Sequence, residues 1–197
     1  MTTHKINHWL SLASPSDWSE GIYWYKNAHE IAQYIADKYN LSINAVIGVI
    51  ACLSPAVSWH QNIVDTVGLI NDPNYKCSTY GNNVKKAISI INGRTPESVL
   101  NNKNSGFKTY SFYLNILHPN TSGAVTIDRH AVSVAVKDPD SNSINTRGKY
   151  NKVADLYRRA GKKAGLLPHQ VQAIVWITFR RVNNTNFSDK QPLISLI

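Results

Sequence analysis

The chain has 197 residues, of which 43% are hydrophobic, and this suits one packed domain or two small interleaved lobes. Two cysteines are too few for a disulfide framework or a four-thiolate iron–sulfur cluster, and no apolar stretch is long enough for a signal peptide or a membrane span, so we expect a cytoplasmic protein without a membrane partner. The net charge of +9 favours a nucleic-acid partner, although basic proteins that bind only membranes or nothing specific share this property.

Helical periodicity recurs along the chain, whereas strand patterns are scarce, so the sequence predicts an all-α fold. Ser42 and Thr95 are expected to cap the helices that follow them. In chain order the predicted helices are Asn27–Tyr39, Ile43–Leu53, Trp59–Ile70, Asn83–Ile91, Pro96–Leu100, Ser105–Leu117, a helix that Asp128 opens, Tyr150–Ala164 and Pro168–Arg181. The second of these is apolar on every side, which indicates a buried central helix.

The helices are predicted to form a single unit over residues 1–197, built from two interleaved lobes. The polar stretch Lys137–Gly148 is the best candidate for a junction between lobes. We therefore expect residues 41–137 to form one lobe, and residues 1–40 and 138–197 to form the other.

Two short motifs carry residues with complementary chemistry. The first is Gly106–Thr109 (GFKT), followed by Leu114–Asn115, and the second is Val125–His130 (VTIDRH). Lys108 and Asp128 lie 20 residues apart, which leaves room for one helix and one loop, so both side chains can reach one cleft. A carboxylate stabilises the charge that develops on a sugar as its glycosidic bond breaks, and an amine of lowered pKa can attack the sugar carbon. Taken singly, the two residues are typical of a solvated lysine and a helix N-cap.

The pattern G-x-K-T-x4-L-N, followed at this distance by V-x-x-D-x-H, resembles the catalytic segment of the helix-hairpin-helix (HhH-GPD) DNA glycosylases, the superfamily of endonuclease III and 8-oxoguanine DNA glycosylase. The match covers roughly residues 105–136. The resemblance implies that Lys108 is the nucleophile of the bifunctional enzymes, that Asp128 is the shared catalytic carboxylate, and that His130 lies near a backbone phosphate. It also implies a DNA-binding cleft between the two lobes.

The resemblance extends more loosely to other residues that would contact DNA. They are Asn104, Ser105 and Gly106, in a phosphate-cradling turn before the catalytic helix, and His60, Gln61 and Asn62, in the region that enters the gap left by an extruded base. The second group is also typical of an ordinary polar helix start.

Gln172 and Trp176 are similar to the glutamine and the aromatic residue that hold a flipped base in the 8-oxoguanine enzymes, by hydrogen bonding and stacking. A spacing of four on an apolar helix is also typical of core packing. Arg158, Arg159, Lys162 and Lys163 form a cluster that is typical of a solvated helix face, or of a surface that follows phosphates.

The sequence therefore predicts a DNA N-glycosylase, with or without AP-lyase activity, that removes a damaged or modified base from double-stranded DNA. A base-modifying enzyme acting on the hypermodified DNA of phages and a non-catalytic DNA-binding protein are the alternatives. We expect a monomer without a cofactor in a bacterial or phage-infected cell. No metal is expected, because the histidines lack metal-ligand spacing with cysteines or carboxylates.

Overall fold

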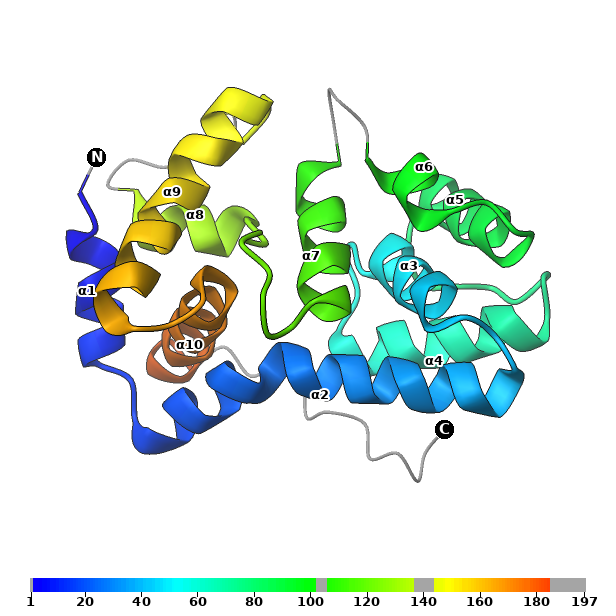
Figure 1. The fold of residues 1–197 in the computed structure, drawn as a ribbon, viewed down its shortest axis with the longest axis horizontal. Helices are drawn as coiled ribbons and strands as arrows, with labels where there is room; N and C mark the ends of the chain where they lie inside the picture. Colours follow the sequence, from blue (N-terminus) through cyan, green and yellow to red (C-terminus); the bar gives the residue numbers. More distant parts are fainter. Residues whose placement is uncertain (1, 102–105, 137–143, 185–197) are drawn as a thin grey trace. The chain divides into compact units, whose positions relative to one another are not determined.

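The computed structural model describes residues 2–101, 106–136 and 144–184, and these segments are all-helical, with no strand among them (Figure 1). The helices are α1 (His4–Ser11), α2 (Pro15–Tyr39), α3 (Ile43–Leu53), α4 (Trp59–Asn71), α5 (Gly81–Ile91), α6 (Pro96–Leu100), α7 (Phe107–Leu117), α8 (Arg129–Ala135), α9 (Arg147–Ala164) and α10 (Pro168–Val182). The predicted all-α class is confirmed. None of these helices is both long and apolar enough to cross a membrane.

The predicted N-caps are confirmed by hydrogen bonds. The Ser42 hydroxyl accepts from the backbone N–H of Ala45, and the Thr95 hydroxyl accepts from that of Ser98. Each bond satisfies one of the N–H groups that the first turn of a helix leaves unpaired. The helices α3 and α6 accordingly begin at the predicted residues.

The prediction that the early helix starts at Asn27 is wrong, because α2 begins at Pro15. Ser14 and Asp17 form a reciprocal capping box: the Ser14 hydroxyl accepts from Asp17 N, and the Asp17 carboxylate accepts from Ser14 N. Proline at the first helical position strengthens the same start. The Arg181 side chain also donates to both oxygens of Asp17, so a residue far along the chain holds this first turn in place.

Packing divides the described chain into two compact units. One boundary falls within α2, between Asn27 and Ala28, and the other falls before α7. We call residues 28–101 the middle unit, and residues 2–27, 106–136 and 144–184 the terminal unit. The predicted lobe of residues 41–137 therefore includes parts of both units, because α7 and α8 belong to the terminal unit.

The core of the middle unit is centred on α3, against which α4, α5 and α6 pack (Figure 1). All residues of α3 from Val46 to Leu53 are buried, which confirms the prediction from its apolar sequence. A Cβ atom at Gly48 would lie 2.7 Å from Cγ of Pro96, so glycine allows α6 to approach this closely.

In the terminal unit, α1, α8, α9 and α10 pack around a common apolar core (Figure 1). Two buried tyrosines of α9 hold the backbone that leads into α8. The Tyr150 hydroxyl donates to Val125 O and accepts from Ile127 N, and the Tyr157 hydroxyl donates to Ala131 O. These bonds fix the position of the segment that carries the second motif.

Candidate functional site

Lys108 and Asp128 both lie at helix starts in the terminal unit. Lys108 is in the first turn of α7, after Gly106, whose φ of 74° is in the left-handed region that glycine adopts without strain. Asp128 is the N-cap of α8, and its Oδ1 accepts a hydrogen bond of 2.7 Å from Ala131 N. Both side chains are half-buried. The other predicted turn residues, Asn104 and Ser105, lie outside the described residues.

The face of α7 that bears Lys108 also contacts the segment before Asp128. Lys108, Phe112 and Asn115 share this face, because positions i, i+4 and i+7 of a helix align. The Asn115 amide donates to the Thr126 hydroxyl at 3.1 Å, two residues before Asp128. No ion pair joins Lys108 to Asp128 in the described part of the chain, so the two groups share a region without bonding each other.

The charge of Asp128 acts on three buried tyrosines around this region. Burial raises the pKa of Tyr25, Tyr150 and Tyr157, and the nearby Asp128 carboxylate adds to each rise. For Tyr150 the resulting pKa is about 12. All three hydroxyls are therefore neutral hydrogen-bonding groups at physiological pH.

A chain of five buried polar side chains runs from the loop after α7 to α10. The Ser122 hydroxyl bonds Oδ1 of Asn115 at 2.7 Å, and Asn115 Nδ2 bonds the Thr126 hydroxyl. The Thr126 and Tyr25 hydroxyls lie 2.9 Å apart, and Tyr25 Oη lies 3.1 Å from Oε1 of Gln172. Each hydroxyl has one hydrogen, so every link is satisfied if Ser122 donates to Asn115, Asn115 to Thr126, Thr126 to Tyr25 and Tyr25 to Gln172. The donors then all point one way, towards Oε1 of Gln172.

The chain leaves the amide nitrogen of Gln172 as a free donor. Gln172 is only 7% exposed, and Nε2 makes no hydrogen bond to any described residue. Nε2 is not among the buried side-chain atoms that lack a partner in the described residues, so this amide nitrogen reaches the surface, where water or a ligand can accept its hydrogens. Trp176, one turn further along α10, is half-buried, and the Arg180 guanidinium lies 4.3 Å from the centre of its ring. Gln172 and Trp176 thus offer a donor and an aromatic ring on one helix, with one face of the ring covered by Arg180.

His130 is exposed in the first turn of α8. Its ring lies 5.9 Å from that of Phe179 in α10. This position is compatible with the predicted phosphate contact.

The predicted residues His60, Gln61 and Asn62 lie in the middle unit, and only His60 is exposed. Gln61 donates to Asp65 at 2.8 Å. Asn62 is 1% exposed, and its amide donates to Ile50 O in the core, which opposes a direct contact with DNA. The structure therefore places Asn62 in the core of the middle unit.

Among the described residues, the net positive charge lies in the terminal unit. Its described residues include thirteen Lys and Arg against four Asp and Glu, an excess of nine. The middle unit has five of each and is neutral. Lys108, Asp128, His130, Gln172 and Trp176 consequently all lie in the unit that would attract a polyanion.

Sequence reasoning missed the contribution of Tyr25, Asn115 and Thr126. Asn115 and Thr126 stand within the two motifs, so their places beside Lys108 and Asp128 were a usable signal. Tyr25 had none, because it lies 101 residues from Thr126 in the chain.

Thiol and metal chemistry receive no support from the described residues. Burial raises the pKa of Cys52 to about 12 and that of Cys77 to about 11, so both thiols remain protonated. No group of three or more His, Cys, Asp or Glu side chains gathers there as a metal site.

Fold and site together define an all-α protein in which one strongly basic unit holds a lysine, a carboxylate and a mostly enclosed glutamine on neighbouring segments. The chain belongs to the family of unknown function DUF7178, whose model matches residues 1–183. No curated protein and no solved structure matches it.

Proposed function

We propose that this protein is a DNA N-glycosylase that binds duplex DNA, extrudes one damaged or modified base and breaks its glycosidic bond. The observation that carries the proposal is the hydrogen-bond chain through Asn115, Thr126 and Tyr25. It links the helix face of Lys108 and the segment of Asp128 to the free donor of Gln172. The resemblance of the two motifs to the HhH-GPD glycosylases supports the same assignment.

Asp128 is assigned the electrostatic role. Oδ1 is held by Ala131 N, whereas Oδ2 makes no hydrogen bond to any described residue. A carboxylate fixed in this way stabilises the positive charge that builds on the sugar as the base leaves with the glycosidic electron pair. It can also accept the proton that the attacking amine or water releases.

Lys108 is assigned as the nucleophile. Its neutral amine would attack C1′ while the base departs and takes up a proton, and opening of the sugar ring would leave a Schiff base between Nζ and C1′. If water attacks instead, the product is an abasic site and Lys108 positions the sugar. The two routes differ in whether a covalent adduct forms.

Gln172 and Trp176 are assigned to the extruded base. The Tyr25 hydroxyl holds Oε1 of Gln172, so Nε2 is oriented to donate to an acceptor on the edge of the base. The Trp176 ring supplies a stacking surface.

The variant Asp128→Asn tests the carboxylate without removing the helix cap. Asparagine caps helices as well as aspartate does, so α8 should keep its start and the protein its thermal stability. We expect excision to fall by about 10²-fold or more, while affinity for DNA changes little. Base release is measured by mass spectrometry on duplexes that each carry one damaged or modified base.

Asp128→Ala is the matched control, because it removes both the carboxylate and the cap and should lower stability as well. Unchanged excision by Asp128→Asn would refute the proposal and leave Asp128 as a cap. A changed but intact nucleoside would indicate base modification instead of excision.

Borohydride trapping tests Lys108 directly. Reduction of the Schiff base should join the protein covalently to DNA, and the adduct should disappear in Lys108→Gln. A peptide map of the adduct identifies the lysine. Trapping through another lysine would contradict the assigned nucleophile, and excision without an adduct would select the water route.

A further inference from the structure

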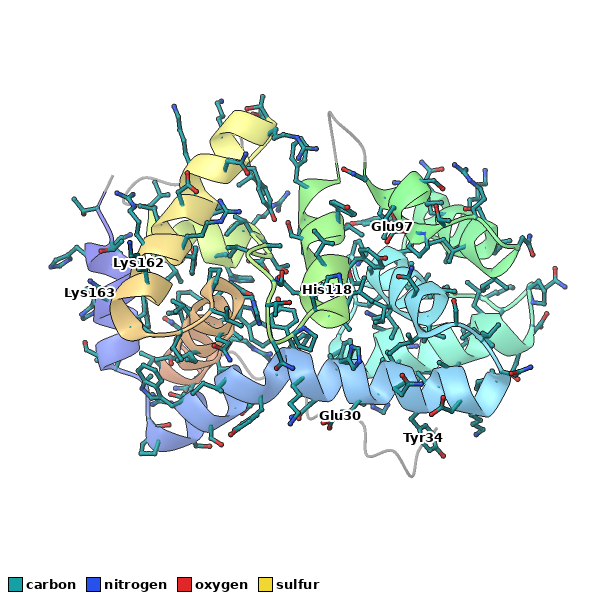
Figure 2. All side chains as sticks on the ribbon, in the orientation of Figure 1. Glu30, Tyr34, Glu97, His118, Lys162 and Lys163 are labelled. Atoms are coloured by element: carbon teal, nitrogen blue, oxygen red, sulfur yellow. The ribbon has the colours of Figure 1, made fainter. Side chains whose placement is uncertain are left out.

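α9 concentrates the positive charge of the terminal unit. The helix carries seven basic residues and a single acidic one, Asp155; the basic residues are Arg147, Lys149, Lys152, Arg158, Arg159, Lys162 and Lys163. Its other face is buried in the core, with Tyr150 and Tyr157 among the buried residues. The packing therefore fixes the direction in which the basic side chains point, and Figure 2 shows Lys162 and Lys163 projecting from the last turns.

Four of these cations have no counter-charge within the described chain. Asp155 is occupied, since it pairs with Arg158 at 2.7 Å. Lys149, Lys152, Lys162 and Lys163 are exposed and make no ion pair with any described residue. The middle unit also has four exposed cations without an ion pair to a described residue, but its five acidic residues balance its five basic ones; these cations are Lys76, Lys85, Lys86 and Arg94.

The stability of the helix accounts for only part of this arrangement, because Lys162 and Lys163 lie in the last turn, where cations favour the helix dipole. Lys149 lies in the first turn, where a cation opposes the helix dipole and where no acidic residue is present. Arg159 and Lys163 are a like-charge pair at i and i+4, which is unfavourable on a helix surface. An external polyanion would offset both effects.

We infer that the outer face of α9 binds the phosphate backbone of duplex DNA; the choice of DNA rests on the proposed function. The 18 residues of α9 make a rigid rod of about 27 Å, and phosphates of one strand rise by about 3.4 Å each, so the helix spans about eight of them. Lys149, Lys152 and Lys163 lie along one side of this rod, because their separations are close to whole numbers of turns.

Insertion into a membrane does not fit the same face. An amphipathic helix that lies on a membrane inserts its apolar side, whereas the apolar side of α9 is buried in the core of the terminal unit. The face is therefore suited to an occupant recognised through charge, and the repeating phosphates of duplex DNA, the substrate of the proposed function, supply that charge at regular spacing.

The test compares two quadruple variants of the full-length protein. The α9 variant carries Lys149→Gln, Lys152→Gln, Lys162→Gln and Lys163→Gln. The matched control carries Lys76→Gln, Lys85→Gln, Lys86→Gln and Arg94→Gln, which removes the same charge from exposed positions of the middle unit. Circular dichroism and thermal melting establish that both variants fold. Binding to a 20-base-pair duplex is measured from 50 to 300 mM KCl by fluorescence anisotropy.

Each lysine on a phosphate contributes a slope of about −0.9 to log K against log salt. We expect the slope of the α9 variant to be shallower by about 3 to 4, and its affinity at the lowest salt to fall at least about tenfold. The control should keep the wild-type slope. Equal slopes for wild type and α9 variant, or an equal loss in the control, would overturn the inference, as would stronger competition by duplex RNA or poly-glutamate than by duplex DNA.

Excision assays separate this inference from the proposed function. If α9 governs DNA binding but no duplex is cut, the DNA surface stands and the glycosylase proposal fails. If excision occurs and the salt dependence of kcat/KM is unchanged in the α9 variant, the glycosylase proposal stands and the α9 surface fails.

Discussion

His169 is a buried titratable group whose surroundings can be read atom by atom. It is 1% exposed, with Nδ1 at 3.2 Å from Ser122 O and Nε2 at 3.0 Å from Pro119 O. A neutral imidazole has one N–H and can donate to only one of these carbonyls at a time. Protonation would satisfy both, but burial disfavours the charged ring and lowers the pKa of His169 from its usual value of 6.5.

This lowered pKa predicts a loss of stability in mild acid. Below pH 6.5 the unfolded chain takes up a proton that the folded chain holds less tightly. The contribution of His169 to the free energy of unfolding should therefore be fully present above that pH. It should fall as the pH drops towards the folded pKa, by at most about 1.4 kcal/mol per pH unit.

Urea unfolding at pH 7.5, 6.5 and 5.5 measures the effect, and His169→Gln should flatten the profile. Equal pH dependence in the wild type and the variant would contradict the assignment.

Some features of the candidate site follow from the local sequence, whereas others depend on residues far away in the chain. Asp128 as a cap follows from one residue and the helix after it, and the structure confirms the cap. The orientation of the Gln172 amide depends on Tyr25, which is 147 residues away in the chain. No pattern along the chain predicts such a bond, because it arises only when two helices pack.

At the scale of elements, close helix packing explains a glycine that the sequence left without a role. Gly21 lies in α2 against α10, and a Cβ atom there would sit 2.6 Å from the Cα and backbone N of Ile174. Backbone atoms cannot rotate away, so the two helices approach this closely only because position 21 has no side chain.

Gly21→Ala is therefore expected to destabilise the protein. Alanine gains about 1 kcal/mol in helix propensity, but overpacking costs about 1–3 kcal/mol, and a clash with main chain lies at the upper end. Gly81→Ala is the control: it is in the first turn of α5, where a Cβ atom meets nothing within 4 Å, and it should be neutral or slightly stabilising. The urea midpoints of unfolding of the two variants test this prediction. A Gly21→Ala protein with the wild-type midpoint would show that α2 and α10 can separate without cost.

The sequence predicts a helix start where a cap stands before an apolar period, as Ser42 does for α3 and Thr95 for α6. The start of α2 was missed although Ser14, Pro15 and Asp17 form a recognisable capping box. The aromatic and polar residues after it lack a clear period, since their burial is set by contacts with α7 and α10 rather than by one apolar stripe.

At the scale of the whole molecule, each unit has its own buried core. Ile47 of α3 and Val175 of α10 are both fully enclosed, one in each unit. Truncating a buried Ile to Ala costs about 2–5 kcal/mol through lost burial and the cavity that remains, and Val to Ala somewhat less.

Amide hydrogen exchange should locate these losses. Ile47→Ala is expected to weaken amide protection in α3 and α5 at least as much as in α9 and α10. Val175→Ala is expected to weaken protection in α9 and α10 at least as much as in α3 and α5. Exchange that increases mainly in the unmutated unit would contradict the division of the chain.

The sequence by itself determined the all-α class, most of the helices, their caps, and the two motifs that hold Lys108 and Asp128, because all of these depend on neighbours within a few turns. Its net charge of +9 was equally plain. Only the tertiary structure decided that this charge belongs to one unit, that Asn62 is used in a core, and that Tyr25 ties the second motif to Gln172. These outcomes depend on which distant segments pack together, and local sequence patterns do not predict the free energy of that packing.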